Sequence, residues 1–398
     1  MKRLWDKGEP LDQRVLRYTA GEDHVLDARL VPYDVRASIA HATMLCAQQH
    51  LADADLQAIK KGLNELAAGH AAGDWGISLE DEDCHTALES RLTDAIGEAG
   101  RRVHLGRSRN DQVLAALRLY MLDAADDLGD AAGHAAAALQ ALAGKQGEVA
   151  LPGYTHMQHG MPSSVGLWAD GFAAELNDDA DGLAAAKRRI SKNPLGSAAG
   201  YGTPGIAIDR EHTQHALGFD TVHSPVTAVQ LSRGKAEAGL TFELVMLMQD
   251  LGKLASDLLL FYTQEFAYIT LPENMTTGSS IMPQKRNPDV LELVRGATAS
   301  VNAALTEILG ICTKLPSGYQ RDLQRIKPAL FRAIDTAQAS AEIMAVLIEG
   351  VTFRPENITL DESIHAAEEA YKIVTEEGVS FREAYQRVGA KLAGKSTS

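Results

Sequence analysis

Residues 234–266 read GKAEAGLTFELVMLMQDLGKLASDLLLFYTQEF, and this stretch decides the fold class. Its large apolar side chains recur at intervals of three or four residues, which is the spacing of one face of an α-helix. They are Leu240, Leu244, Met248, Leu251, Leu254 and Leu258. A helix of about 30 residues is about 45 Å long, so the stretch predicts a helix much longer than the usual three turns.

The same helical spacing appears in four other parts of the chain. We predict long helices from Asp111 to about Leu142, from Ser163 to about Lys192, from Pro288 and from about Pro328. An aromatic content of only 5% also favours helix packed on helix over a β-sandwich. The fold class is therefore predicted to be all-α, with an elongated bundle of long helices at its centre.

The flanking segments differ from this centre. Residues 1–105 indicate shorter, interrupted helices, and the tail after Phe353 contains two short amphipathic stretches. Loops rich in glycine, proline and polar residues separate the long helices. They are NPLGSAAGYGTPG (193–205), LPENMTTGSSIMPQKRNP (271–288) and LPSGYQ (315–320). A rigid scaffold can present such loops, so we expect function there.

The composition of the 398 residues excludes several classes of protein. With 45% hydrophobic and 23% charged residues, the chain is too apolar to be disordered. It carries 38 basic and 53 acidic residues, a net charge of −15, so we expect no nucleic-acid partner. The opening MKRLWDKGEPLDQR lacks the apolar core of a signal peptide, and no apolar run reaches 18 residues. We therefore expect a cytoplasmic protein with no membrane partner.

Residue types that ligate metals are scattered along the chain. The three cysteines, Cys46, Cys84 and Cys312, are far apart and form no CxxC pair. The sequence also contains no HExxH motif and no clustered Cys/His set. We therefore expect neither a metal nor a cofactor.

The first segment with candidate chemistry is RRVHLGRSRNDQV, residues 101–113. Ser108 and Asp111 have the spacing of a capping box just before an apolar run. Arg107 and Arg109 then lie at a helix start, where free backbone N–H groups and the helix dipole attract anions. The alternative is a well-capped helix whose arginines are merely solvated.

A second segment is LPGYTHMQ, residues 151–158. Thr155, His156 and Gln158 follow a predicted Pro-Gly turn and precede a long helix. A histidine can carry a proton near neutral pH if a partner orients it. A single histidine is more often structural or simply exposed, and that alternative stays open here.

The third segment, TTGSSIMPQKRNPDVLELVRG at residues 276–296, is the most informative. Glycine and two serines are followed by Lys285 and Arg286, and six hydroxyl or amide side chains precede the helix. Asn287 and Pro288 have the residue types of the N-cap and the first position of that helix. A mobile lid that closes on an anionic substrate would use this combination. A purely structural loop is the alternative.

Positive charge is concentrated in these segments although the protein is acidic. Residues 101–110 carry a charge of +4, and residues 279–288 and 319–327 carry +2 each. The remaining residues therefore hold a charge of −23. This pattern indicates a multiply anionic small molecule as the ligand.

The sequence GSSIMPQKRNP at 278–288 resembles the signature of the fumarase/aspartase superfamily, whose members release fumarate from a succinyl-bearing substrate. Within this superfamily the chain is similar to the argininosuccinate lyases and their delta-crystallin relatives. The matching segments are HLGRSRNDQV, LPGYTHMQ, NPLGSAAGYG, TTGSSIMPQKRNPDVLELVRG and GVSFREAYQRVG. The similarity runs from about residue 30 to Gly389, which is nearly the whole chain.

The resemblance implies three mostly helical domains and a homotetramer. The expected N-terminal domain is 1–105, and the central long-helix bundle is 106–352 with a mobile loop at 276–288. A short helical domain at 353–398 would complete the chain. In this family, segments of three different subunits build each active site. Such sharing would unite loops that lie at different ends of long helices.

The reaction implied by the resemblance is the reversible elimination of fumarate from argininosuccinate. It yields arginine in the last step of arginine biosynthesis, through a carbanion-like aci-carboxylate intermediate. By motif position, Ser279 is the candidate base, and Lys285 and Asn287 hold the carboxylate whose negative charge grows. His156 is the candidate acid, with Glu292 as its carboxylate partner.

The resemblance also implies a set of substrate-binding positions. Those on the fumarate side are Ser108, Arg109, Asn110, Thr155 and Gln158. Those of the N-terminal domain are Asp83 and His85, and those that hold the arginine-side amino acid are Tyr319, Gln324 and Lys327.

Four departures from the family pattern bear on the substrate. Leu105 replaces a common threonine, LSRGK at 231–235 replaces an acidic segment, and the C-terminal domain is short. RIK at 325–327 replaces an acidic stretch near the amino-acid end of the site, so Arg325 and Ile326 remove negative charge there. An acylated, argininosuccinate-like substrate is therefore an open alternative.

Two further alternatives concern the class of function. A sister lyase would act on adenylosuccinate, but the sequence contains no Gly-rich phosphate loop beyond the shared signature. A non-catalytic structural protein of the crystallin type is disfavoured, because Ser279, His156 and Lys285 are all present.

Overall fold

The computed structural model describes residues 12–395, and the chain divides into two compact units. The first consists of Met1–Leu128, Gly182–Val245 and Ser300–Thr336, and the second of Gly129–Asp181, Met246–Ala299 and Ala337–Ser398. We call them the first and the second unit and describe each by itself.

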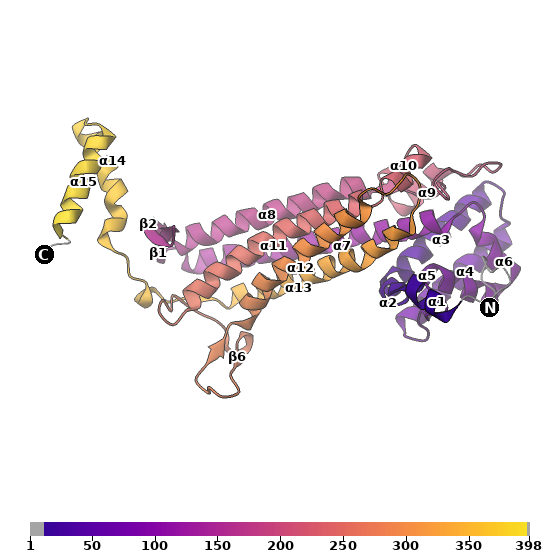
Figure 1. The fold of residues 1–398 in the computed structure, drawn as a ribbon, viewed down its shortest axis with the longest axis horizontal. Coiled ribbons are helices and arrows are strands. Elements are labelled where there is room, and N and C mark those ends of the chain that lie inside the picture. The colour runs from indigo at the N-terminus through magenta and orange to yellow at the C-terminus, as the bar shows by residue number, and fades with distance from the viewer. Residues whose placement is uncertain (1–11, 396–398) are drawn as a thin grey trace. The chain divides into compact units, whose positions relative to one another are not determined.

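Long helices supply the framework of both units (Figure 1). They are α7 (Arg109–Gln146), α8 (Val165–Ile190), α11 (Lys235–Tyr262), α12 (Asp289–Cys312) and α13 (Ile326–Glu349). All five long helices predicted from the sequence are confirmed, with ends a few residues from those expected. The apolar stripe of α11, from Leu240 to Leu258, is buried at every position. Its burial against neighbouring helices is the main reason that this helix is stable.

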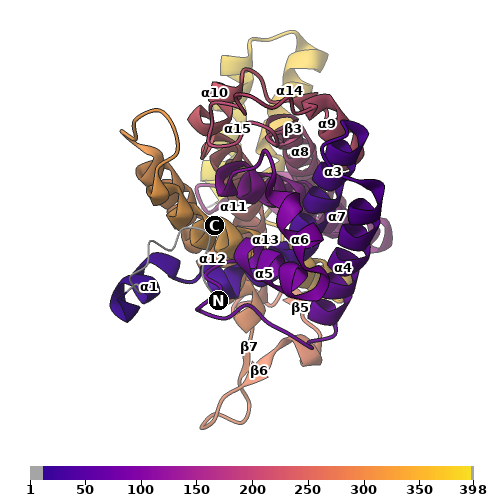
Figure 2. The same ribbon diagram turned by 90° about the vertical axis from the view of Figure 1, so that its right-hand side faces the viewer.

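Shorter helices make up the rest of the first unit, as predicted for residues 1–105. They are α1 (Gln13–Ala20), α2 (Asp23–Leu26), η1 (Asp27–Leu30), α3 (Val31–Ala47), α4 (Asp53–Ala71), α5 (Cys84–Ile96), α6 (Glu98–Arg101), η2 (Arg102–His104), α9 (Arg210–Leu217), α10 (Val226–Leu231) and η4 (Arg321–Arg325). Figure 2 shows α4, α5 and α6 side by side. Two short parallel strands, β3 (Lys192–Asn193) and β4 (Thr221–Val222), join the loop after α8 to the segment after α9.

A hydrophobic core in the first unit connects α3 with α7 and α9. Small residues line its centre, including Ala37 of α3 and Ala115 of α7, and neither is exposed. Phe219, just after α9, fills the space beside them. The small side chains let the helices approach closely, which holds the start of α7 against the N-terminal helices.

The second unit adds three short antiparallel strand pairs to its parts of the long helices. They are β1 (Ala150–Thr155) with β2 (Gln158–Ser164), β5 (Ile269–Thr270) with β8 (Thr352–Phe353), and β6 (Thr277–Gly278) with β7 (Arg286–Asn287). Trp168 contacts Phe172, Phe261 and Phe353 edge-on, with ring centroids 5.5 to 5.7 Å apart. Its ring N–H donates to Asp257 at 2.9 Å, so the polar atom of this aromatic core is satisfied.

The predicted amphipathic stretches near the C-terminus form a helical hairpin of α14 (Ala366–Glu377) and α15 (Phe381–Lys395), drawn in yellow in Figure 1. Its small core consists of Ala370, Ala384 and Val388. Gly378 ends α14 in the left-handed conformation with φ +66°, which favours glycine at a helix end.

The protein is therefore all-α, with only short strands among the described residues. None of the helices in residues 12–395 is both long and apolar enough to cross a membrane. The three-domain division at 105 and 352 stays a prediction. The first eleven residues of its N-terminal domain and the last three of its C-terminal domain lie outside the described residues.

Candidate active site

The start of α7 is held by the predicted capping box. Ser108 Oγ accepts the backbone N–H of Asn110 at 3.4 Å, and Asp111 Oδ1 accepts the N–H of Ser108 at 3.0 Å. Two N–H groups that the helix itself leaves unpaired are thereby satisfied. Arg109 and Asn110 consequently occupy the first turn of the helix. Of the two arginines predicted at this helix start, Arg109 lies there, whereas Arg107 precedes the helix, is buried and donates to Ser38 Oγ at 2.9 Å.

Asp111 also binds the glycine-rich loop that follows α8. Its Oδ2 accepts the backbone N–H groups of Gly196 at 3.0 Å and Ala198 at 2.8 Å. Burial raises the pKa of this carboxyl to about 6, although the N–H donors and the nearby Arg107 counteract that rise. One buried carboxylate thus fixes both the helix start and the loop.

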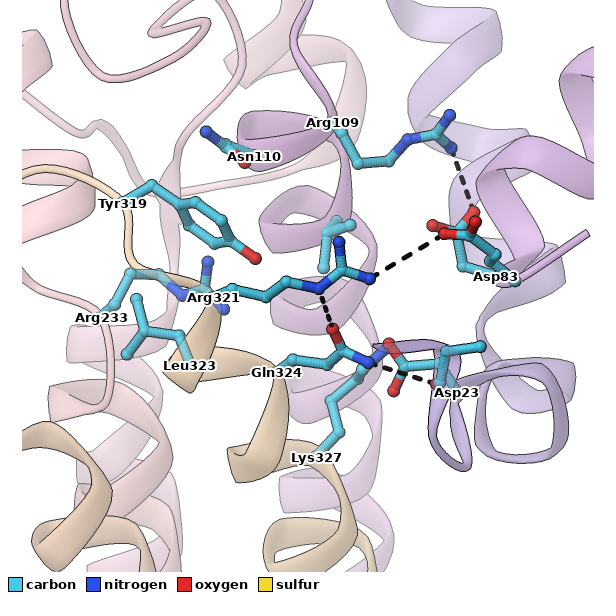
Figure 3. Close-up of a pocket in the computed structure, with 13 residues that line it drawn as sticks. Asp23, Asp83, Arg109, Asn110, Arg233, Tyr319, Arg321, Leu323, Gln324 and Lys327 are labelled. Atoms are coloured by element: carbon cyan, nitrogen blue, oxygen red, sulfur yellow. Dashed lines mark hydrogen bonds and ion pairs between the residues drawn. The ribbon is translucent and has the colours of Figure 1, made fainter. Parts of the chain in front are cut away.

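A cavity of about 290 Å³ opens beside this helix start, within the first unit (Figure 3). Six predicted site residues line it: Asp83, Arg109, Asn110, Tyr319, Gln324 and Lys327. They come from the loop before α5, the start of α7, the loop after α12, and the segment η4–α13. Folding therefore gathers residues that are more than 200 positions apart in the sequence.

Pairs of opposite charge line this pocket. Arg109 donates to Asp83 at 3.1 Å, and Asp83 also caps α5 by accepting the backbone N–H of Thr86 at 2.7 Å. Burial would raise the pKa of Asp83, but Arg109, His85 and the capping hydrogen bonds lower it below its usual range. Asp83 is therefore a carboxylate held in one orientation from two sides.

Lys327 is the most buried cation of the pocket, with 4% of its surface exposed. Its ammonium lies 2.6 Å from Asp27 Oδ1 and 2.9 Å from Asp23 Oδ2. Burial alone would lower the pKa of Lys327, but the two carboxylates more than offset it and raise that pKa. Burial, with repulsion from Asp27, raises the pKa of Asp23 to about 6 despite the lysine.

His85 does not line the pocket and lies in a buried polar network beside it. Its Nδ1 is 3.1 Å from Asp34 Oδ2, and both side chains are 0 to 1% exposed. Gln112 donates to the same carboxylate at 3.0 Å. Burial would raise the pKa of Asp34, but the charges of His85 and Arg107 and the hydrogen bonds lower it to about 2. Contact of His85 with substrate stays a prediction.

Among residues 12–395, one group of three side chains has the types and spacing to hold a metal ion: Asp27, Cys84 and His85. All three are buried. Asp27 already accepts the ammonium of Lys327, and burial raises the pKa of the Cys84 thiol well above its usual value. A neutral thiol and a lysine-bound carboxylate are poor ligands for a cation.

In the second unit, Thr155, His156 and Gln158 lie at the tip of the β1–β2 hairpin. Thr155 pairs with Gln158, and His156 and Met157 form the turn with φ values of +53° and +61°. A two-residue turn with both φ values positive normally uses Asn or Gly, so this one places a histidine where it is conformationally costly. All three predicted side chains are exposed.

The predicted Pro-Gly turn in this segment is wrong. Pro152 and Gly153 lie inside strand β1, opposite Pro162 and Met161, with a bulge between Gly153 and Tyr154. A proline without its N–H is tolerated because both strands of the hairpin are edge strands.

Ser279 and Lys285 lie in the loop between β6 and β7, and Asn287 lies in β7. Residues 280–286 are all exposed, and Ser279 is half-buried. Ser279 Oγ accepts the backbone N–H groups of Ile281 at 3.4 Å and Met282 at 3.2 Å. The serine oxygen therefore faces two donors from its own loop.

Helix α12 begins at Asp289, later than the sequence predicts. Asn287 is not its N-cap, because it pairs with Thr277 in the strand ladder and is held extended. The carbonyl of Pro288 instead accepts the first helical N–H groups, from Leu291 at 3.0 Å and Glu292 at 3.3 Å. Glu292 is exposed, and within residues 12–395 it forms no ion pair with His156.

Sequence reasoning missed four charged residues of the pocket: Asp23, Glu82, Arg233 and Arg321. Arg321 belongs to the basic segment 319–327, and Arg233 belongs to LSRGK at 231–235, one of the departures from the family pattern. The positive charge of these segments could therefore have marked both arginines as candidates. Glu82 precedes Asp83 directly, and Asp23 had no distinguishing neighbour. Only the fold shows that these four side chains line one pocket.

Comparison with known proteins adds to this geometry. A family model described as Lyase matches residues 12–303. The chain is 45% identical to an argininosuccinate lyase of Sorangium cellulosum (strain So ce56), a match that covers 98% of this chain and 91% of that protein. An argininosuccinate lyase of Xylella fastidiosa (strain 9a5c) is 42% identical, with 98% and 87% covered.

Among solved structures, the chain is similar to an EDDS lyase in complex with formate. The TM-score is 0.81 at 24% sequence identity, and the match covers 96% of this chain and 76% of that one. At this identity the similarity supports the fold alone.

Proposed function

Because the chain belongs to the argininosuccinate lyase family, we propose how its own residues catalyse the reaction of that family. The protein is a carbon–nitrogen lyase that releases fumarate from argininosuccinate and leaves arginine. The relatives do not favour adenylosuccinate, since those described above are argininosuccinate lyases. A cytoplasmic location, as expected from the sequence, is part of the same proposal.

The reaction makes three demands on the site. A base must remove a proton from the carbon beside a carboxylate, and that carboxylate must be stabilised as it gains charge. An acid must then protonate the guanidino nitrogen as the C–N bond breaks. Base, electrostatic clamp and acid therefore have to surround the succinyl half of the substrate.

Ser279 is the proposed base, and one observation carries this assignment. Its Oγ already accepts hydrogen bonds from two backbone N–H groups of its loop. Donors of this kind stabilise negative charge on the oxygen, which a serine needs before it can take a proton. Lys285 and Asn287, on the same hairpin, would hold the carboxylate whose charge grows, and loop closure would exclude water.

His156 is the proposed acid, and Glu292 its carboxylate partner. The positive φ value of His156 supports a functional role, because backbone strain at an exposed turn is retained when the side chain is needed there. Thr155 and Gln158, which close the same turn, would hold the other oxygens of the succinyl half. We assign Ser108, Arg109 and Asn110 to this half as well, because the first turn of α7 attracts anions.

The pocket of the first unit is the proposed site of the arginine half. Tyr319, Gln324 and Lys327 line it together with Asp83. Mixed charges suit this half of the substrate, which carries an ammonium, a carboxylate and a guanidino group. The charge of His85, in the buried network beside the pocket, would help to keep Asp83 ionised.

We further propose that a homotetramer completes each active site. The pocket belongs to the first unit, whereas the proposed base and acid lie on two hairpins of the second unit whose tips are exposed. The exposed tips of the β1–β2 and β6–β7 hairpins would therefore serve the pockets of neighbouring subunits, and the three domains of the family would follow the boundaries given above.

A direct assay tests the proposed function. Purified protein is mixed with argininosuccinate, and fumarate is followed by its ultraviolet absorbance while arginine is quantified by amino-acid analysis. Equal amounts of fumarate and arginine are expected. Adenylosuccinate serves as the comparison substrate, and faster fumarate release from it would overturn the assignment.

A further inference from the structure

We propose that Asp23 is a specificity-determining residue that contacts the positively charged α-ammonium of the arginine half of the substrate. This inference rests on the proposed function. It concerns a residue that neither the sequence motifs nor the family signature singled out.

The first step is the charge around Lys327. Asp23 and Asp27 lie 2.9 and 2.6 Å from its ammonium, so two carboxylates share one cation. The group of three therefore keeps one negative charge in excess. Asp27 is 0% exposed and does not line the pocket, whereas the Asp23 side chain is 14% exposed and does. The excess charge is consequently presented to the ligand by Asp23.

The second step is that the pocket's arginines do not offset this excess. Arg109 pairs with Asp83 at 3.1 Å (Figure 3). Arg321 lies 3.9 Å from Glu82. Arg233 lies 3.7 Å from Glu237, and its guanidinium is 5.9 Å from the ring centre of Tyr319. Each arginine thus has a carboxylate of its own, and Arg109 also lies 3.8 Å from a second one, that of Glu89. All three arginines are therefore paired with carboxylates other than Asp23.

The third step is the cost of an unmatched buried charge. Ionised groups away from water are stable only when they are paired. Burial and the nearby Asp27 raise the pKa of Asp23 although Lys327 lies 2.9 Å away, so the lysine alone does not offset the cost of this carboxylate. An α-ammonium placed against Asp23 would supply that cation, whereas an acylated nitrogen is neutral and larger.

The fourth step concerns RIK at 325–327, the departure from the family pattern that left an acylated substrate as an alternative. Arg325 is exposed, with its guanidinium 5.9 Å from the ring centre of Tyr18, and Ile326 is fully buried. Neither lines the pocket. The loss of negative charge at these two positions therefore leaves the pocket unchanged, and Asp23 provides a carboxylate inside it.

The test compares two substrates and three variants. Fumarate release is measured with argininosuccinate and with Nα-acetylargininosuccinate, for the wild type and for Asp23→Asn, Asp23→Glu and Glu22→Gln. Glu22 is the matched control, because it is an exposed carboxylate next to Asp23 that does not line the pocket. Circular dichroism and size-exclusion chromatography confirm the fold of each variant.

Asp23→Asn should raise KM for argininosuccinate roughly 10- to 100-fold, as expected for loss of a charged hydrogen bond. Its kcat should change by less than about threefold, since Asp23 is remote from the bond that breaks. KM for the acetylated substrate should stay the same or fall. Asp23→Glu should recover part of the discrimination, and Glu22→Gln should behave as the wild type.

A binding measurement on the wild type needs no variant. By calorimetry, arginine should bind at least about tenfold more tightly than Nα-acetylarginine. Equal binding of the two, or an equal effect of Asp23→Asn on both substrates, overturns the role of Asp23 while fumarate release still supports the proposed function. Absence of fumarate release from argininosuccinate by the wild type would instead overturn the proposed function itself.

Discussion

Replacement of Asp34 by asparagine should destabilise the protein through loss of one buried charge. The carboxylate is 0% exposed, lies 3.1 Å from His85 Nδ1, and accepts from Gln112 at 3.0 Å and Ser38 at 3.4 Å. Asparagine has nearly the same shape as a protonated aspartate. The substitution therefore isolates the stability that depends on ionisation.

The magnitude follows from the pKa of Asp34, which is about 2 in the folded protein against an ordinary value of 3.8. Each pKa unit corresponds to about 1.4 kcal/mol, so ionised Asp34 contributes about 2 kcal/mol at pH 7. Because the folded pKa is depressed, this contribution is complete above pH 4 and is lost as the pH falls toward 2. The difference between the variant and the wild type should shrink over the same range.

Urea unfolding followed by circular dichroism at fixed protein concentration measures this difference. With a slope of about 3 kcal/mol per molar urea, the midpoint should fall by about 0.7 M at pH 7. Asp123→Asn is the control, because Asp123 is 51% exposed and lies 3.7 Å from Arg36. Such a surface pair contributes at most about 1 kcal/mol. Equal shifts for the two variants, or a shift for Asp34→Asn that is as large at pH 3 as at pH 7, would refute the reasoning.

Four further predictions concern activity and packing. Ser279→Ala should lose about 10²- to 10⁴-fold in rate with its fold intact, and a residual rate above about a tenth of wild type would exclude serine as the base. Inactive His156→Asn and Ser279→Ala proteins can be dissociated and reassociated together. If the two residues come from different subunits, up to roughly a quarter of the active sites should be wild type and activity should return in part. No recovery despite proven subunit exchange would contradict shared sites. Gly234→Ala should cost about 2–4 kcal/mol in thermal unfolding, because φ is +85° and the new Cβ would meet Cys312 Sγ; Gly389→Ala, where nothing lies within 4 Å, should not destabilise. Since the pKa of Asp23 is about 6, KM for argininosuccinate should rise as the pH falls from 7 to 5 and Asp23 loses its charge, whereas Asp23→Asn should lack this rise.

Helical spacing predicted the long helices well because each one buries a continuous apolar face. The stripe of α11 shows this, with every member from Leu240 to Leu258 buried. Boundaries set by pairing with another segment were not predictable in this way. Asn287 has the residue type of an N-cap, but its pairing with Thr277 keeps it in a strand. Pro152 and Gly153 have the residue types of a turn, but the facing strand β2 keeps them extended.

The candidate site shows the same limit. Motif resemblance identified Asp83, Tyr319 and Lys327, which line the pocket. Motif resemblance did not identify Asp23. The role proposed for Asp23 depends on Asp27 and on Lys327, which is 304 positions later in the sequence. Charge excess is a property of several side chains that meet in space, and no single segment carries it.

The double attachment of Asp111 has a consequence for dynamics. One carboxylate accepts N–H groups from Ser108, at the start of α7, and from Gly196 and Ala198 in the loop after α8. Release of either segment leaves a buried carboxylate short of donors, so the other segment loses part of its own anchor at the same time. The loop and the first turn of the helix are therefore expected to fluctuate together, on one timescale, as a single cooperative element.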